Sequence, residues 1–540
     1  MRRRLLARLA AVGTATALMA GVAACSDPTN GGTSGQGGGS DLSVYLYQKP
    51  KRFSPLDSFA GAEGQVMSLV FDNLVSVNAA YQYEPRLAQS WDISPDSKTY
   101  TFHLRKGLKW SDGKPLTSAD VLFSYQLLAN PAVSDGMAGR LADVVGVKDF
   151  TSGKAKTIAG FSAPDPDTFV VKLNSANRGL LSNIAGGTYA FIVPQHVLGN
   201  VPIDKIKDDP FWNKPTVGAG PYTFVQYRTD QYVEVVRNPN FRQPASINRI
   251  FLKTVTSDVA TAQLGTGELT LAQVAATDAK TVQGMSGLTT VSQKGGNGFV
   301  RVAVNQTQQR FRDPRVRQAM LYALDRKQFV QKSLGGYGLV PNTSLMGKFV
   351  PSGIDDYAYN PAKAKALLAA AHWDSSKPVT LAWIPGTRDR DDFVTLAQSQ
   401  LNAVGIKVVP KQVQAAELGQ IQDKATFDLT LFGGGLYTVD GSSVAPILSC
   451  KAIPLKAGNI SRFCDPKIDA LLDQAVAEPD DAKRLGIYQQ VARLDNQESS
   501  YLWAYSPDTI WAYNKKLTGF TGHGNFTLVF WNAYQWKLSG

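Results

Sequence analysis

The sequence has few of the residues on which most enzymes and metal sites depend. Only four histidines and three cysteines occur in 540 residues. The histidines are far apart and none has a neighbour at metal-ligand spacing; they are His103, His196, His372 and His523. No G-x-S-x-G turn, P-loop or S-x-x-K motif with its companion motifs is present. We therefore expect no catalytic site, no metal and no cofactor, and a binding function is favoured.

Long apolar runs and clusters of charge are missing from residues 41–540. No segment there stays apolar for the roughly 18 residues that a membrane-spanning helix needs. The formal charge of +12 includes four arginines within residues 1–24, which hold no acidic residue, so the rest of the chain carries 12 − 4 = +8. Because the basic residues are scattered and not interleaved with aromatics, the sequence predicts no nucleic-acid binding.

The N-terminus has the pattern of an export signal. Residues 1–8 carry four arginines, and an apolar run from Leu9 to Ala20 follows that is short for a transmembrane span. Val22-Ala23-Ala24-Cys25 resembles the lipobox of bacterial lipoproteins, which implies a signal peptide over 1–24 and a lipid anchor on Cys25. The alternative is an ordinary signal peptide with a chance cysteine. Residues 25–40 are mostly small and polar, and they predict a flexible tether with a reach of about 20 Å.

The two remaining cysteines are Cys450 and Cys464. A cysteine pair in an exported chain predicts one disulfide. It would close a loop of about 15 residues, worth about 3 kcal/mol in the chain-entropy model. A redox or metal pair is the alternative, but C-x-x-C spacing and a nearby histidine are both missing.

Predicted helices alternate with short apolar strands along the chain. Helix starts are marked by Thr117 with Asp120 three residues later, by Asp313-Pro314 and by Asp465-Pro466. Strands are predicted over residues 42–47, 100–104, 168–173, 232–236, 379–383, 406–409, 427–432 and 502–505. This alternation predicts α/β lobes with mainly parallel sheets.

Aromatic side chains lie near the predicted strand ends and in loops, where solute-binding clefts use them for stacking and hydrogen bonding. For each of them, a place in the core is the alternative. The set comprises Tyr45, Tyr47, Phe59, Trp212, Tyr222, Tyr227, Phe299, Tyr437, Trp503 and Tyr505.

One long segment and several short ones follow a recognisable order. The long segment runs from Leu87-Ala88-Gln89-Ser90-Trp91 to Asp120-Val121. The short ones are Gly218-Ala219-Gly220-Pro221-Tyr222, Arg237-Asn238-Pro239-Asn240-Phe241, residues 313–326, Tyr359-Asn360-Pro361 and Cys464-Asp465-Pro466. Together they resemble the family 5 extracellular solute-binding proteins, which are the peptide, nickel and oligosaccharide receptors of ABC importers. The resemblance covers Asp41 to Trp536.

The resemblance implies an α/β, two-lobed fold like that of periplasmic binding proteins, with an extra domain inserted in the first lobe. Lobe I would comprise residues 41–75, 206–300 and 506–540, the inserted domain II residues 76–205, and lobe III residues 301–505. The crossovers between the lobes are expected near Phe299–Asn305 and Trp503–Pro507. A solute would be enclosed when the lobes close.

The candidate ligand contacts follow from the same resemblance. In peptide-binding members, a Trp and an Asp in the loop after the strand matching residues 427–432 hold the ligand, and the Asp pairs with its amine. Here that loop, residues 433–440, has no Trp, and Asp440 comes several residues late, where it could instead match a structural Asp. The predicted ligand contacts are Tyr47, Phe59, Gly61, Phe299, Gly433, Gly434, Gly435, Tyr437, Asp440 and Trp503.

The resemblance further implies a monomeric, non-enzymatic receptor that delivers its solute to an ABC permease and its ATPase. We expect it on the outer face of the bacterial cytoplasmic membrane, held there through Cys25. A short peptide is the first expectation for the solute, an oligosaccharide or other organic solute the second, and nickel or a metallophore the third. An exported hydrolase is the alternative of another class, but no nucleophile–base pair supports it.

Overall fold

A computed structural model describes residues 40–57, 61–133, 137–185, 190–296, 298–434, 439–453 and 458–539. The predicted signal, Cys25 and most of the predicted tether lie outside the described residues. The chain separates into a short N-terminal unit and a unit of residues 39–540, which holds all the described helices and strands. Among the described residues, no helix has both the length and the apolar character needed to cross a membrane.

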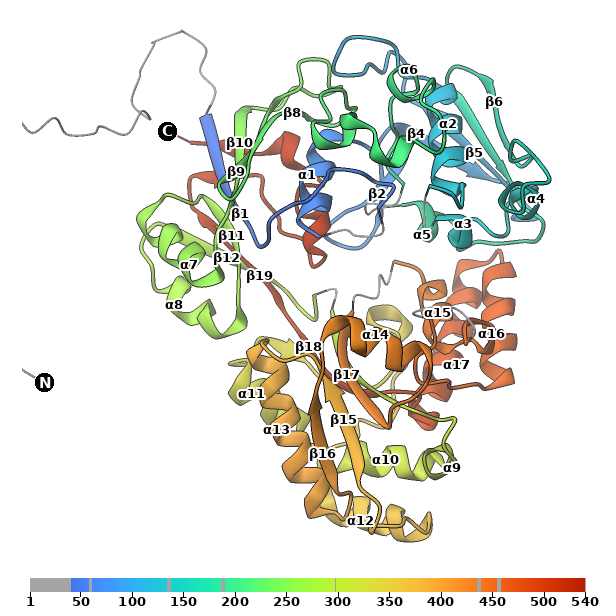
Figure 1. The fold of residues 1–540 in the computed structure, drawn as a ribbon, viewed down its shortest axis with the longest axis vertical. Helices are drawn as coiled ribbons and strands as arrows, with labels where there is room; N and C mark the ends of the chain where they lie inside the picture. The colour runs from blue at the N-terminus through green and yellow to red at the C-terminus, as the bar shows by residue number, and fades with distance from the viewer. Residues whose placement is uncertain are drawn as a thin grey trace, which may run out of the picture. The chain divides into compact units, whose positions relative to one another are not determined.

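A seven-stranded sheet gathers strands from distant parts of the chain (Figure 1). Its strand order is β12-β19-β11-β1-β10-β9-β8. Strand β1 runs parallel to β10 and β11, and the other neighbours are antiparallel. The strands are β1 (Ser40–Leu46), β8 (Tyr222–Arg228), β9 (Tyr232–Arg237), β10 (Ile247–Thr254), β11 (Leu271–Val274), β12 (Leu288–Gln293) and β19 (Thr509–Asn514).

A six-stranded sheet has the order β14-β18-β13-β17-β15-β16. Strand β15 runs parallel to both of its neighbours, β16 and β17, and all other pairs in this sheet are antiparallel. The prediction of mainly parallel sheets is therefore wrong, because an apolar run shows that a strand is buried but not which direction its neighbour takes. The strands are β13 (Phe299–Val304), β14 (Gly338–Leu339), β15 (Val379–Trp383), β16 (Val408–Gln412), β17 (Leu429–Gly434) and β18 (Leu502–Pro507).

A smaller antiparallel sheet has the order β4-β5-β7-β6, formed by β4 (Ala88–Ile93), β5 (Thr99–Leu104), β7 (Thr168–Lys172) and β6 (Phe161–Asp165). Two short antiparallel pairs complete the strands, β2 (Val75–Val77) with β3 (Tyr83–Pro85) and β20 (Leu517–Thr518) with β21 (Lys537–Leu538). Helix α2 (Ser118–Ala129) packs on the four-stranded sheet and begins with the predicted capping box of Thr117 and Asp120.

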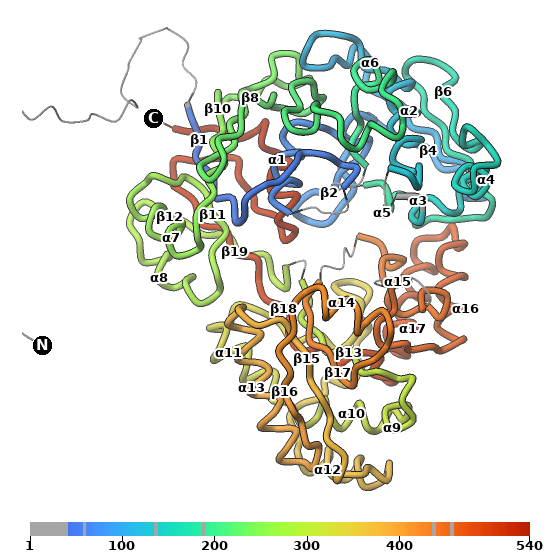
Figure 2. The backbone as a smooth tube through the Cα atoms, viewed as in Figure 1, coloured from blue at the N-terminus to red at the C-terminus, as the bar shows by residue number. Residues whose placement is uncertain are grey.

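Helices cover both faces of the six-stranded sheet (Figures 1 and 2). One face packs on α10 (Pro314–Tyr322), α11 (Arg326–Ser333), α12 (Pro361–Ala370) and α13 (Arg388–Ala403). The other face packs on α16 (Pro466–Ala477) and α17 (Asp481–Glu498). The predicted caps Asp313 and Asp465 each accept a hydrogen bond from the first turn of their helix. The further helices of five or more residues are α4 (Val147–Thr151), α5 (Leu180–Ile184), α7 (Ser257–Thr266), α8 (Ala279–Gln283) and α14 (Ala415–Asp423).

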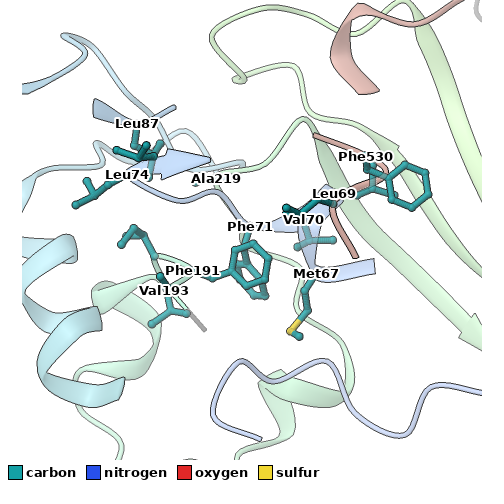
Figure 3. Packing of buried hydrophobic residues seen from close by; sticks show 14 of the residues in the cluster. Met67, Leu69, Val70, Phe71, Leu74, Leu87, Phe191, Val193, Ala219 and Phe530 are labelled. Atoms are coloured by element: carbon teal, nitrogen blue, oxygen red, sulfur yellow. The ribbon is translucent and has the colours of Figure 1, made fainter. Parts of the chain in front are cut away.

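Helix α1 (Ala62–Val70) carries part of the largest core, where Met67, Leu69 and Val70 lie near Phe530 (Figure 3). The predicted turn at Gly218 and Gly220 packs directly against the end of this helix. A Cβ atom at Gly218 would lie 2.0 Å from the carbonyl oxygen of Val70, and one at Gly220 2.3 Å from that of Leu69. The turn at Gly218 and Gly220 therefore needs glycine for close backbone packing, and its role is structural.

The two large sheets are joined by short connections. Strand β12 ends at Gln293 and β13 begins at Phe299, while only Asp508 separates β18 from β19. The Asp508 carboxylate accepts hydrogen bonds from Ser292 Oγ at 2.8 Å and from the Gly295 amide at 3.0 Å, which ties the two connections together. The first connection lies just before the predicted crossover at Phe299–Asn305, since Phe299–Val304 is a fully buried strand of the six-stranded sheet.

The structure joins Cys450 and Cys464 in a disulfide, with Cα atoms 4.7 Å apart, as the sequence predicts. The bond links the turn after α15 (Ala445–Leu448) to the residue before the N-cap of α16. Lys451 forms an ion pair with Asp473 of α16 at 2.7 Å close to this link. The disulfide therefore ties two segments of a helical layer together.

Candidate ligand-binding site

A cavity of about 640 Å³ is lined by residues of the seven-stranded sheet and by residues at the start of the helix that follows β15 of the six-stranded sheet. Tyr45 and Tyr47 come from β1 and the residue that follows it, and Gln273 and Val274 come from β11. Thr387 and Arg390 come from the start of α13, which follows β15. The cavity has the size of small-molecule sites and lies at the carboxyl ends of parallel strands, where α/β proteins place their ligands.

The start of α13 is held firmly by acidic side chains. The Asp391 carboxylate accepts hydrogen bonds from Trp383 Nε1 at 2.8 Å and from the Gly386 amide at 3.0 Å. The Asp389 carboxylate accepts one from the hydroxyl of Tyr505 at 2.8 Å. Both carboxylates lie in the first turn, where the helix dipole favours negative charge. The turn that presents Arg390 to the cavity is therefore fixed by contacts that do not use Arg390 itself.

The side chain of Arg390 has no ion pair and no hydrogen bond within the described part of the chain, and its Nε atom is buried without an acceptor. The neighbouring acids are engaged elsewhere, since Asp389 binds Tyr505 and Asp391 binds Trp383. The guanidinium lies over Gly433, where a Cβ atom would be 2.5 Å from Nη2. A cation in this position is available to an anionic group inside the cavity.

Two aromatic rings form the opposite wall. Tyr47 is 40% exposed and meets the ring of Phe526 edge-on, with centroids 5.4 Å apart. Burial, and to a smaller extent Glu63 and Tyr45, raise the pKa of Tyr47 to about 12, so its hydroxyl stays a hydrogen-bond donor at neutral pH. Gly61 leaves the space that this residue needs, because a Cβ there would lie 2.9 Å from the Tyr47 hydroxyl.

Strand β17 extends past its neighbour at this end of the sheet. Its pairing with β15 stops where Trp383 faces Leu431, and Pro385 follows two residues later. Its pairing with β13 continues to Gly434, which faces Phe299. Within the described residues, 432–434 therefore have a strand partner on one side only, and they are partly exposed. This leaves a short free strand edge beside Arg390.

The structure places the other predicted contacts in different surroundings. Phe299 and Trp503 are each 1% exposed and pack on one another with ring centroids 5.1 Å apart, so they form core below the free strand edge. Trp212, Tyr222 and Tyr505 of the wider aromatic set are also fully buried. For Phe299, Trp503 and Tyr505 the burial follows from strands β13 and β18, which are covered on both faces.

The carboxylate of Asp440 is buried and bound by neighbouring side chains and backbone. It is 3% exposed, pairs with Arg484 at 2.6 Å, and accepts a hydrogen bond from the Ser442 amide at 2.9 Å as the cap of a 3₁₀ turn. Tyr488 adds a third contact from its hydroxyl at 3.4 Å. Asp440 does not line the cavity beside Arg390, and these contacts agree with the structural alternative for this residue. Phe59, Gly435 and Tyr437 lie outside the described residues.

Sequence reasoning missed Arg390 and Gln273 as cavity residues, and it named Tyr45 only among the aromatics. Arg390 had a usable signal, because it stands just after the predicted strand 379–383, at the end where α/β ligand sites form. Phe526 had none, because it lies on a 3₁₀ turn far along the chain from Tyr47. Among the described residues, no group of three His, Cys, Asp or Glu side chains is placed to hold a metal ion.

Comparison with known proteins agrees with this architecture. Residues 82–453 match the family model described as bacterial extracellular solute-binding proteins, family 5 Middle. A Brucella ovis protein named "Putative ABC transporter peptide-binding protein" is 33% identical over 444 residues, which cover 79% of each chain. The oligopeptide-binding protein AppA of Bacillus subtilis is 26% identical over 93% of this chain and 92% of its own length.

Solved structures show the same fold. The structure of AppA from Bacillus subtilis in complex with a nonapeptide covers 93% of this chain and 99% of its own, with 25% identity and a TM-score of 0.76. The substrate-binding protein CtaP of Listeria monocytogenes reaches a TM-score of 0.81 at 22% identity, over 93% and 100% of the two chains. The α/β binding-protein fold that the sequence predicts is thereby confirmed.

Membership follows from the extent of these matches and fixes the general activity. The family consists of solute-binding components of ABC transporters that act outside the cytoplasm, and they bind their solutes without transforming them. The predicted non-enzymatic role is confirmed on this ground. With its family model spanning more than half of the sequence and its fold matched throughout, this chain belongs to family 5 of the bacterial extracellular solute-binding proteins.

Proposed function

We propose that the chain is a lipid-anchored receptor that captures a short peptide in the cavity beside Arg390 and delivers it to an ABC permease. With lobe I, domain II and lobe III bounded as the sequence predicts, this cavity would lie between lobes I and III. The motif ending at Cys25 supports the anchor, and the tether would let the receptor work close to its permease. The protein would then act on the outer face of the cytoplasmic membrane.

The free edge of β17 is the observation that carries the peptide proposal. Residues 432–434 offer backbone groups on the side away from β13, and an extended peptide can pair with such an edge. Gly433 and Gly434 keep this edge clear of side chains. Backbone pairing binds peptides of many sequences, and it is a type of contact that a sugar cannot supply.

Arg390 gives the peptide a fixed end. Its guanidinium lies over Gly433 and has no acceptor in the described part of the chain. A C-terminal carboxylate can accept two parallel hydrogen bonds from a guanidinium, and charge-assisted pairs of this kind are among the strongest in proteins. The names of the relatives agree with this choice, since AppA of Bacillus subtilis is an oligopeptide-binding protein whose structure holds a nonapeptide.

Isothermal titration of the purified protein tests the proposal. Peptides of four to nine residues should bind, and oligosaccharides should not; binding of sugars alone would overturn the peptide assignment. The same peptides with an amidated C-terminus should bind roughly 10- to 100-fold more weakly, because a charge-assisted hydrogen bond to Arg390 is lost. Arg390→Gln should abolish the difference between acid and amide, whereas Arg388→Gln, two residues earlier on the same helix, should preserve it.

The anchor is tested separately in cells. Wild-type protein should fractionate with the membrane, and Cys25→Ser should release it or leave it unprocessed. A membrane-bound Cys25→Ser protein with its signal removed would show that another segment holds the protein to the membrane.

A further inference from the structure

Arg301, on strand β13 in the interior of the six-stranded sheet, is a buried cation with no counter-ion in the part of the chain that the structure describes. Its side chain is 6% exposed, and its Nε and Nη1 atoms are buried with no hydrogen-bond acceptor among the described residues. Burial lowers the pKa of Arg301, as expected for a charge taken out of water without a carboxylate beside it. Such a group is costly to bury unless something pairs with it.

Two deeply buried arginines on the helices that cover this sheet have hydrogen-bond acceptors around their guanidinium groups. Arg317, 1% exposed, donates to four different backbone carbonyl groups. Arg326, 2% exposed, donates to the carbonyl oxygens of Pro341 and Trp503 and to other acceptors. Both hold loops in place by filling a ring of acceptors. Arg301 has no such ring, so a purely structural role leaves its donors unexplained.

The surroundings of Arg301 are aromatic. Its guanidinium carbon lies 4.7 Å from the ring centroid of Phe432, 5.1 Å from that of Tyr501 and 5.6 Å from that of Trp503. Ring faces stabilise the cation above and below its plane. They do not satisfy the N–H groups that point outward in the plane. Trp503 adds a further donor on the neighbouring strand, because its Nε1 is also buried without an acceptor.

Arg301 reaches the free edge of β17. A Cβ atom at Gly434 would lie 3.9 Å from Arg301 Nη2, so the glycine leaves this end of the guanidinium uncovered. The preceding Gly433 faces Arg390 instead. Because successive residues of a strand point to opposite faces, the two guanidinium groups approach the end of β17 from opposite faces of the sheet. A segment lying along this edge would meet a cation on each side.

We propose that Arg301 binds an acidic side chain of the captured peptide, so that the receptor selects peptides containing Asp or Glu. The donors of Arg301, which have no acceptor among the described residues, match a carboxylate, which is acceptor-only and accepts the two parallel N–H groups of a guanidinium. This inference rests on the proposed function, in which Arg390 takes the C-terminal carboxylate. Arg301 would take a second negative charge on the other face of the strand.

A matched peptide pair tests the inference first on the wild-type protein. Two peptides that differ only by Glu in place of Gln are titrated calorimetrically at moderate salt, with the position of the acid moved along the peptide in a short series. At one position the Glu peptide should bind roughly 10- to 100-fold more tightly, as expected for a buried charge-assisted hydrogen bond. Equal affinities at every position would overturn the role of Arg301 and leave the peptide proposal standing.

Variants then assign the effect to the residue. Arg301→Gln should bring the Glu and Gln peptides to equal affinity, and Arg301→Lys should keep part of the preference. Arg249→Gln is the control, because this arginine is half-exposed on β10 and pairs with Glu234 away from the cavity. Loss of affinity for both peptides by the same factor in Arg301→Gln would show a structural role and refute the contact.

The experiments distinguish a failure of the peptide assignment from a failure of the Arg301 contact. If no peptide binds but non-peptide carboxylates bind in a manner that depends on Arg301, the peptide assignment is wrong and the carboxylate contact is supported. If peptides bind with a preference for acid that Arg301→Gln does not change, the peptide assignment stands and the contact is wrong. If neither peptides nor carboxylates bind, both are refuted.

Discussion

Replacing Arg301 by methionine, in comparison with the same change at Arg317, measures directly whether Arg301 is an unpaired buried charge. Methionine removes the charge and keeps an unbranched side chain that packs well against aromatic rings. Both arginines belong to the same sheet and its helices, and both are almost completely buried. Arg317 has carbonyl acceptors and an ion pair with Glu498 at 3.4 Å, whereas Arg301 has neither among the described residues, so the two variants compare a satisfied buried charge with an unsatisfied one.

The expected losses differ several-fold. Arg317→Met would leave four carbonyl oxygens, in hydrogen bonds that are buried or partly buried, without this donor, those of Phe311, Arg312, Glu498 and Ser499. At about 1 kcal/mol for each orphaned acceptor, the free energy of unfolding should fall by roughly 4 kcal/mol. Arg301→Met orphans no acceptor, and the lost cation–π attraction is offset by removing the cost of burying a charge. Its free energy of unfolding should stay within about 1 kcal/mol of wild type.

Urea unfolding of the ligand-free proteins, followed by tryptophan fluorescence, gives both values from the midpoints at equal slope. A loss of about 4 kcal/mol in Arg301→Met would refute the reasoning, because it would mean that Arg301 supports the fold as Arg317 does. Adding an acidic peptide at 100 times its Kd should stabilise wild type by about 2.7 kcal/mol. The same concentration should stabilise Arg301→Met clearly less.

Three further outcomes follow from the structure. Gly433→Val should place a side chain against Arg390 and on the free strand edge, and weaken peptide binding at least tenfold in calorimetry while circular dichroism stays unchanged. Replacing Cys450 and Cys464 together by serine should cost about 3 kcal/mol in urea unfolding, and a loss below 1 kcal/mol would contradict the loop-closure argument. Burial lowers the pKa of His523 to about 4, below its value near 6.5 in the unfolded chain, so the unfolded state binds the extra proton first. Stability should therefore be full above pH 6.5 and fall by up to about 3 kcal/mol towards pH 4, and His523→Gln should flatten this dependence.

The local elements were accessible from the sequence because their signals are local. Thr117 with Asp120, and the Asp-Pro pairs at 313–314 and 465–466, satisfy the first amide groups of a helix within one turn of chain. The disulfide was predictable because only Cys450 and Cys464 remain besides Cys25, in a chain expected to be exported. The direction of neighbouring strands had no such signal, and the expectation of mainly parallel sheets failed for that reason.

The candidate site was only partly accessible. Tyr47, Gly61, Gly433 and Gly434 were named as ligand contacts, and the structure places them at or beside the cavity, where that role stays a prediction. Asp440 looked like an amine anchor by analogy, but its pairing with Arg484 on α17 depends on a helix more than forty residues later. No local pattern predicts such a partner.

The sequence by itself determined the family, the fold class and the disulfide, because ordered motifs, helix caps and cysteine number are properties of the chain taken residue by residue. Only the tertiary structure decided which charges are free. Arg301, Arg317 and Arg326 are alike in sequence, each standing in or beside an apolar segment. Folding brings acceptors such as the carbonyl groups of Glu498 and Pro341 to Arg317 and Arg326, whereas Arg301 receives none among the described residues. The remaining cation lies at the end of β17, where a bound solute can supply what the chain does not.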